Sequence, residues 1–166
     1  MMEENGAWLE RAMANHEAAL LRLCFAYLGD AALAEDAVQE SFVKAYKGYD
    51  CYRQESDEKT WLTRIAINTC KDMRRGAWFR HVDRSAALES LPEGEVPFTE
   101  RDDTLTRAVM ALRPKLREVV LLHDWQGLTA EETAKSLGVP RSTMYHRLDR
   151  AHRLLRKELE AWYHDR

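Results

Sequence analysis

The chain has 166 residues, of which 45% are hydrophobic, and a net charge of −3, so it can form one domain or two small ones around a buried core. No apolar run approaches the ~20 residues that cross a bilayer, and the acidic start MMEENGAW lacks the order of a secretory signal. Direct membrane insertion is therefore not expected, and the cytoplasm is the expected compartment. The three cysteines, Cys24, Cys51 and Cys70, are widely spaced without a CxxC pair, which indicates neither a disulfide framework nor a zinc site.

Three helical patterns cover the first part of the chain, at about residues 8–28, 31–48 and 59–75. Gly29-Asp30 separates the first two patterns, and a polar loop from Asp50 to Asp57 separates the second from the third. Helices of this length with short connections predict an all-helical bundle.

The middle pattern has one apolar face and one largely acidic face. Its apolar positions recur at helical spacing and predict a core stripe of Ala34, Ala37, Val38, Phe42, Ala45 and Tyr46. The opposite face carries Glu35, Asp36, Gln39, Glu40 and Val43. An exposed valine is usually of no consequence, but beside acids it also suits a docking face for a basic helix, and both interpretations stay open.

The third pattern predicts a basic stripe opposite an apolar face. The apolar face consists of Leu62, Ile65, Ala66, Cys70 and Met73, and the stripe of Arg64, Asn68, Lys71 and Arg75. The stripe is either a solvated surface or a surface for phosphates. Trp61, at the start of the helix, is expected to be a packing anchor in the core. In the preceding loop, Tyr52, Arg53 and Gln54 could stack on and hydrogen-bond an unpaired base.

Residues 76–103 lose the helical period and collect glycine and proline among acids, which predicts a flexible linker. The net charge differs between the two parts of the chain. Residues 1–103 carry 13 Lys and Arg and 20 Asp and Glu, whereas residues 104–166 carry 12 Lys and Arg and 8 Asp and Glu. The two parts are expected to bind different partners. We therefore expect one domain over residues 1–75, a linker over 76–103 and a second domain over 104–166.

The second domain contains a predicted helix-turn-helix. Thr129 followed by Glu132 forms a capping box that starts a short helix, Gly138 supplies a left-handed turn, and Pro140 suits the first turn of the next helix. Along that second helix the predicted buried stripe is Met144, Leu148, Ala151 and Leu155.

The outward side of the second helix is strongly basic. From residue 141 to 157 there are six Arg and Lys but a single acid, Asp149. A basic face alone could simply be solvated, but after a capped helix and a glycine turn it favours a recognition helix in the major groove. Asp149 could accept a hydrogen bond from cytosine or pair with Arg153, and the sequence leaves both roles open.

Three segments in this order resemble the extracytoplasmic-function sigma factors of bacterial RNA polymerase. AEDAVQESFVKAY, residues 34–46, resembles the family's polymerase-binding helix, and TWLTRIAINTCKDMRR, residues 60–75, resembles the helix that engages the −10 promoter element. Residues 127–159, from Gly127 to Leu159, resemble the −35 binding module. The resemblance implies two small helical domains, of sigma regions 2 and 4, in an alternative sigma factor for promoter recognition, DNA melting and transcription initiation.

The resemblance also implies roles for individual residues. Polymerase would be bound by Asp36, Gln39, Glu40 and Val43. The −10 element would be bound by Arg64, Asn68, Lys71 and Arg75, and a flipped base by the loop of Tyr52, Arg53, Gln54 and Glu55. The −35 groove would be read by Ser142, Tyr145, His146, Asp149 and Arg150, with Arg141, Arg147 and Arg153 near phosphates. The implied partners are core RNA polymerase, promoter DNA and a cognate anti-sigma factor, with no cofactor, metal or small-molecule substrate.

Two other classes of protein compete with this interpretation. An ordinary helix-turn-helix regulator without a sigma role would fit the C-terminal module equally well, and it would bind duplex DNA by itself, usually as a dimer. An enzyme could use Glu35, Asp36 and Glu40 as metal ligands. It is disfavoured because no Glu-x-x-His pair, nucleophile elbow or phosphate-cradling glycine loop accompanies these acids.

Overall fold

The computed structural model describes residues 2–52, 54–79 and 100–164, and every regular element in these ranges is a helix. The chain divides into two compact units, Met1–Pro92 and Glu93–Arg166. The predicted all-helical fold with two small domains is therefore confirmed. Most of the linker predicted over 76–103 lies outside the described residues. None of the helices in the described ranges combines the length and the hydropathy that crossing a bilayer requires.

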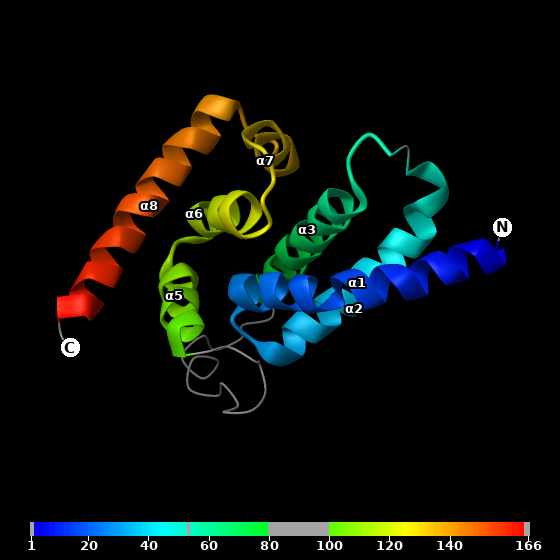
Figure 1. The fold of residues 1–166 in the computed structure, drawn as a ribbon, viewed down its shortest axis with the longest axis horizontal. Coiled ribbons are helices and arrows are strands. Elements are labelled where there is room, and N and C mark those ends of the chain that lie inside the picture. Colours follow the sequence, from blue (N-terminus) through cyan, green and yellow to red (C-terminus); the bar gives the residue numbers. More distant parts are fainter. Residues whose placement is uncertain (1, 53, 80–99, 165–166) are drawn as a thin grey trace. The chain divides into compact units, whose positions relative to one another are not determined.

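Over residues 2–52 and 54–79 the N-terminal unit is built from three long helices (Figure 1). In chain order they are α1 (Met2–Leu28), α2 (Ala31–Gly48) and α3 (Glu58–Phe79), and the short 3-10 helix η1 (Tyr49–Cys51) follows α2 directly. The three predicted helices are confirmed, but the first begins earlier and the third ends later than predicted. The third does not end at Arg75 because a single glycine, Gly76, costs about 1 kcal/mol in a helix and does not break it.

The connection between α1 and α2 is a sharp, capped turn. Gly29 has a φ of +72°, a conformation that a side chain would resist. The carboxylate of Asp30 then accepts the backbone N–H of Leu33 at 2.9 Å and so caps α2. The turn lets α2 fold back along α1, and the two helices lie side by side (Figure 1).

The core of the N-terminal unit lies around the inner face of α2. The predicted stripe is confirmed for Ala34, Ala37, Val38, Phe42 and Ala45, whereas Tyr46 stays partly exposed. Against this face pack large buried side chains of α1 and α3, namely Leu20, Leu23, Tyr27, Leu62 and Ile67. Cys24 and Cys70 are also buried here, and the hydrogen bond between the two thiols, together with burial, raises the pKa of Cys70.

In the residues that the structure describes, the C-terminal unit has four helices and a π-helical turn. They are α5 (Glu100–Ala111), α6 (Pro114–Val119), the turn η2 (Val120–Trp125), α7 (Ala130–Leu137) and α8 (Arg141–His164). The predicted stripe of α8 is confirmed, since Met144, Leu148, Ala151 and Leu155 are all buried. They share the core of this unit with Val119 to Leu122.

The predicted helix-turn-helix is confirmed in its local chemistry. The Thr129 hydroxyl accepts the Glu132 N–H at 3.1 Å, and the Glu132 carboxylate accepts the Thr129 N–H at 2.9 Å. Gly138 ends α7 with a φ of +65°. Because both ends of α7 are fixed, the direction in which α8 leaves the turn is fixed as well.

Two glycine substitutions should have opposite effects on stability. A Cβ would meet no atom within 4 Å at Gly138 or at Gly6, so the two positions differ mainly in backbone conformation. Gly138→Ala should lower the free energy of unfolding by about 1–2 kcal/mol, because its φ is left-handed. Gly6→Ala, within helix α1, should raise it by about 0.5–1 kcal/mol. Hydrogen exchange of the amides in α7 and α1 measures both effects; a stabilising Gly138→Ala would contradict the assigned turn.

Candidate nucleic-acid interface

The outer surface of α2 carries the residues predicted to bind polymerase, and we call it the acidic face. Asp36, Gln39 and Glu40 are exposed, and Val43 is 46% exposed. The structure adds Leu33, which is 39% exposed and lies ten residues before Val43, on the same side of the helix. Leu33 was not among the residues predicted for this face, although the same helical spacing includes it. In the described part of the chain no three His, Cys, Asp or Glu side chains form a group that could hold a metal.

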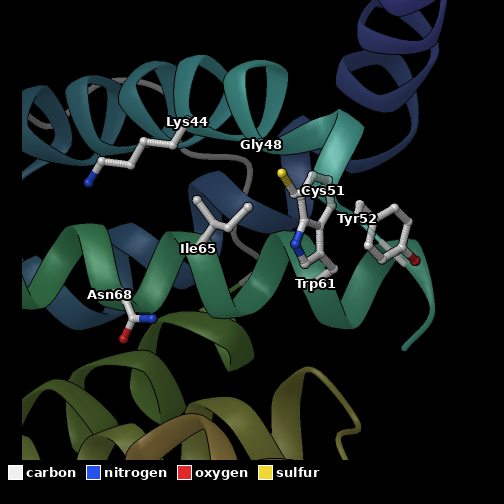
Figure 2. A pocket seen from close by; sticks show the side chains of 7 residues that line it. All are labelled: Lys44, Gly48, Cys51, Tyr52, Trp61, Ile65 and Asn68. Carbon is white, nitrogen blue, oxygen red and sulfur yellow. The ribbon is translucent and has the colours of Figure 1, made fainter. Parts of the chain in front are cut away.

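A pocket of about 330 Å³ opens between α2 and α3 (Figure 2). It is lined by Lys44 and Gly48 of α2, by Cys51 and Tyr52, and by Trp61, Ile65 and Asn68 of α3. The structure thus brings two predicted DNA-binding residues, Tyr52 and Asn68, to one cavity. Gln54 is exposed in the loop with a φ of 55° and does not line the pocket, and Arg53 lies outside the described residues.

One wall of the pocket is aromatic. The rings of Tyr52 and Trp61 are stacked, with centroids 4.3 Å apart and an angle of 16° between their planes. The Tyr52 hydroxyl donates to the backbone carbonyl of Ser56, and burial, followed by the charges of Glu58 and Asp57, raises the pKa of Tyr52. The expectation that Trp61 is a core side chain was wrong, because it is partly exposed and faces the pocket.

The other end of the pocket is polar. The Lys44 ammonium donates to the Thr69 hydroxyl at 3.2 Å and lies 4.0 Å from the Asp72 carboxylate, while Asn68 is exposed. In Figure 2, Lys44 and Asn68 lie at the end away from Tyr52 and Trp61. An aromatic wall beside an amide and an ammonium provides stacking, base-edge hydrogen bonds and phosphate attraction, which is the chemistry that single-stranded nucleic acid requires.

The basic stripe of α3 lies on the surface beside the pocket. Asn68 and Arg75 are exposed, and Arg64 and Lys71 are partly exposed. The Arg75 guanidinium is 4.0 Å from the Asp72 carboxylate and its side chain is 76% exposed, so this exposed ion pair is weak and leaves the guanidinium accessible. The stripe therefore continues the positive charge of Lys44 along α3.

The outward face of α8 presents most of the residues predicted to bind the −35 element. Arg141, Ser142, Tyr145, His146, Asp149, Arg150 and Arg153 are exposed, and Arg147 is partly exposed. Arg153 donates to the Asp149 carboxylate one helical turn away, which is one of the two roles left open for Asp149. The ring of His152 lies 2.5 Å from the carboxylate of Asp124, so it ties α8 to η2.

Both units match known protein families. Residues 12–80 match the family model of sigma-70 region 2, and residues 102–155 match that of sigma-70 region 4. The chain is 31% identical to the RNA polymerase sigma-E factor of Streptomyces avermitilis in an alignment that covers 92% of this chain and 85% of that protein. The chain belongs to the extracytoplasmic-function sigma factors of the sigma-70 family. Its function is that of an alternative sigma factor, which directs RNA polymerase to promoters, and a helix-turn-helix regulator without a sigma role is not favoured.

Other relatives of this sigma factor agree with the assignment. The extracytoplasmic-function sigma factor SigW of Bacillus subtilis is 30% identical, and the alignment covers 84% of this chain and 82% of SigW. The solved sigma factor RpoE of Bartonella quintana has a TM-score of 0.76 at 24% identity, covering 91% of this chain and 96% of that one. Solved CnrH has a TM-score of 0.67 at 22% identity, covering 96% and 92%. At these identities the two structures show that the fold is shared.

The cap of α3 should make the stability of this sigma factor depend on pH. Asp57 accepts the backbone N–H of Thr60 at 2.6 Å, and this hydrogen bond holds the pKa of Asp57 below its ordinary value. The stabilisation is therefore complete above the ordinary carboxyl pKa and is lost as the pH falls through the lower folded value. Asp57→Ala should cost about 1 kcal/mol at neutral pH and less at about pH 3, measured by denaturant unfolding. Glu55→Ala, in the same loop, should change little; an equal Asp57→Ala cost at both pH values would contradict the cap.

Proposed function

We propose that the N-terminal unit of this sigma factor binds both core polymerase and the unpaired −10 strand, on two separate surfaces, while α8 reads the −35 element. The observation that carries the proposal is the pocket between α2 and α3, because its aromatic wall and polar end suit an unpaired base. A regulator that binds only duplex DNA has no use for such a pocket. The binding activities then lie in the two units expected at residues 1–75 and 104–166.

We assign polymerase binding to the acidic face of α2. Its charged side chains, Asp36 and Glu40, are exposed around Val43, and Leu33 extends the apolar contact toward the start of the helix. An apolar centre with acids around it fits a basic helical partner, since the charges steer the encounter and the apolar side chains gain from burial. The partner on core polymerase would be its clamp coiled coil.

We assign the −10 strand to the pocket and to the basic stripe. Extracting a base from the duplex costs a few kcal/mol, and stacking on an aromatic wall offsets part of that cost. Tyr52 and Trp61 supply the wall, Asn68 a polar contact, and Lys71 and Arg75 the phosphate affinity. Arg53 and Gln54, in the loop, and Arg64, earlier on α3, would contact the same strand.

We assign the −35 element to α8. The helix follows a capped helix and a left-handed glycine turn, so its exposed N-terminal half suits the major groove. Ser142, Tyr145, His146, Asp149 and Arg150 would face base edges, and Arg141, Arg147 and Arg153 would lie near phosphates.

We further propose that a cognate anti-sigma factor restrains this sigma factor. The solved RpoE of Bartonella quintana is in complex with the anti-sigma factor NepR, and solved CnrH is in complex with the cytosolic domain of CnrY. We also infer that this sigma factor acts in the cytoplasm and has no catalytic activity of its own. Membership of a family of transcription initiation factors supports both assignments.

Transcription from a promoter library tests the proposed function. The purified protein is incubated with a genomic promoter library, with and without core RNA polymerase. We expect initiation at a defined set of promoters, and stable DNA binding by the protein only in the presence of core enzyme. Tight binding to paired half-sites by the protein alone, without any initiation with core enzyme, would support the regulator instead.

Reversing the charge of the acidic face should weaken polymerase binding. Asp36→Arg together with Glu40→Arg should reduce affinity for core enzyme about tenfold or more, and should make binding less sensitive to salt. Helical content should not change, because both side chains are exposed. Glu10→Arg with Glu17→Arg makes the same charge change on the exposed side of α1 and should leave affinity unaltered. Equal affinity of the α2 variant and its α1 control would contradict the assignment.

Removing Asp149 should distinguish its two roles. If Asp149 accepts from cytosine, Asp149→Ala should relax preference at one −35 position by about 1–3 kcal/mol. If it positions Arg153, to which it is hydrogen-bonded in the structure, the variant should weaken binding to several sequences by a smaller amount. Binding of a −35 sequence library by the holoenzyme separates the outcomes. An even rise in affinity for all promoters would show that Asp149 only opposes nonspecific binding.

A further inference from the structure

Glu58, the first residue of α3, connects the N-terminal half of α1 to the start of α3. Its Oε2 accepts a hydrogen bond from the indole N–H of Trp8 at 2.7 Å, and its Oε1 lies 3.0 Å from Nε2 of His16. Trp8 is only 4% exposed, and the Glu58 side chain is 34% exposed. Both carboxylate oxygens are engaged by α1, so the carboxylate can neither rotate nor move away without losing a bond.

Trp8 also belongs to a continuous group of aromatic rings that ends in the pocket wall. Its ring stacks on Tyr49, with centroids 4.2 Å apart, and lies 5.9 Å from the ring of Trp61. Trp61 in turn stacks on Tyr52. Asn5, on the same helix, donates to the Asp50 carboxylate at 3.3 Å. The first turns of α1 therefore contact η1 and, through Trp8, the base of the pocket wall.

We propose that Trp8 and Glu58, with His16, are positioning residues that hold the aromatic wall of the pocket in the orientation that receives the unpaired base. The inference rests on the proposed function of the pocket. None of the three residues lines the pocket, so each acts through Trp61 and Tyr52. Trp8 lies before residue 12, where the match to the region 2 family model begins, so this contact involves a part of the chain outside that match.

The physical reason is preorganisation. Tyr52 and Trp61 are partly exposed, and Tyr52 lies in the polar connection between η1 and α3. Without the contact with Trp8, Trp61 could adopt other rotamers. The free energy needed to order the wall would then reduce the free energy of base binding. The hydrogen bond from the indole N–H to Glu58 fixes the position of Trp8 itself. A ring held only by apolar contacts can shift, whereas a hydrogen bond restrains it to one position.

Three variants of the holoenzyme test the inference. Trp8→Phe keeps a ring on Tyr49 but removes the donor, Glu58→Ala removes both bonds, and Glu58→Gln can still accept from Trp8 and donate to His16. The probe is a promoter selected from a library by the unaltered holoenzyme, with 2-aminopurine at successive −10 positions of the nontemplate strand. The measured quantity is the ratio of opening rates for promoters that differ only at the flipped base.

We expect Trp8→Phe and Glu58→Ala to reduce this ratio about three- to tenfold, the change that follows when a side chain must be ordered on binding. Glu58→Gln should retain most of the selectivity. Glu17→Gln, one residue beyond His16 and exposed, is the matched control and should retain all of it. Affinity for core enzyme should stay unchanged in all four variants, because the acidic face of α2 is not altered. A purely structural role would instead lower the midpoint of thermal unfolding without changing base selectivity.

A variant in the pocket itself separates failure of this inference from failure of the proposed function. Trp61→Ala changes the wall directly. If it lowers selectivity while Trp8→Phe and Glu58→Ala do not, the pocket receives the base but α1 does not position it, and the inference is overturned. If Trp61→Ala has no effect on selectivity, the pocket is not the site of the flipped base, and both proposals are overturned.

Discussion

The packing of one face of α2 determines how the N-terminal unit functions. Ala34, Ala37, Ser41 and Ala45 are all fully buried, and such small side chains let α1 and α3 approach the α2 backbone closely. With this face buried, the acidic face must point outward, and we propose that polymerase binds there. The last turn of α2 then lies next to α3, and the pocket forms between them (Figure 2). Loss of this packing would remove both surfaces together.

The helices and the core stripes of α2 and α8 could be predicted from the sequence, because period and capping are local properties, whereas Ile65, predicted to face inward on α3, lines the pocket. The core stripe of α2, the capping box at Thr129 and the turn at Gly138 follow from residues within a few positions of one another. The pocket could not be predicted in the same way, because it joins residues of α2 to residues of α3. Trp61 illustrates the limit: a tryptophan at a helix start normally packs in the core, and only the neighbouring Tyr52 and Trp8 make it a pocket wall.

The two units present their charge differently, in accordance with their tasks. In the C-terminal unit a basic face on one helix suffices, because duplex DNA offers a groove of fixed shape and phosphates at regular spacing. The N-terminal unit carries an acidic surface on α2 and a basic surface on α3, both within one small helical bundle. The two surfaces lie on neighbouring helices, and of the residues that form them only Asn68, on α3, lines the pocket. In the proposed function, this arrangement lets polymerase and the unpaired strand bind at the same time.

The reactivity of Cys51 tests most directly whether the pocket receives the unpaired strand. Cys51 is exposed and lines the pocket, whereas Cys24 and Cys70 are buried, so alkylation of the native chain reports on the pocket without any substitution. Mass spectrometry of the peptide that contains Cys51 gives the rate in the free protein, in the holoenzyme and in its promoter complexes. We expect the rate to fall sharply when the promoter opens, and not when the promoter is held as a closed duplex. An unchanged rate in the open complex would show that the pocket does not receive the unpaired strand.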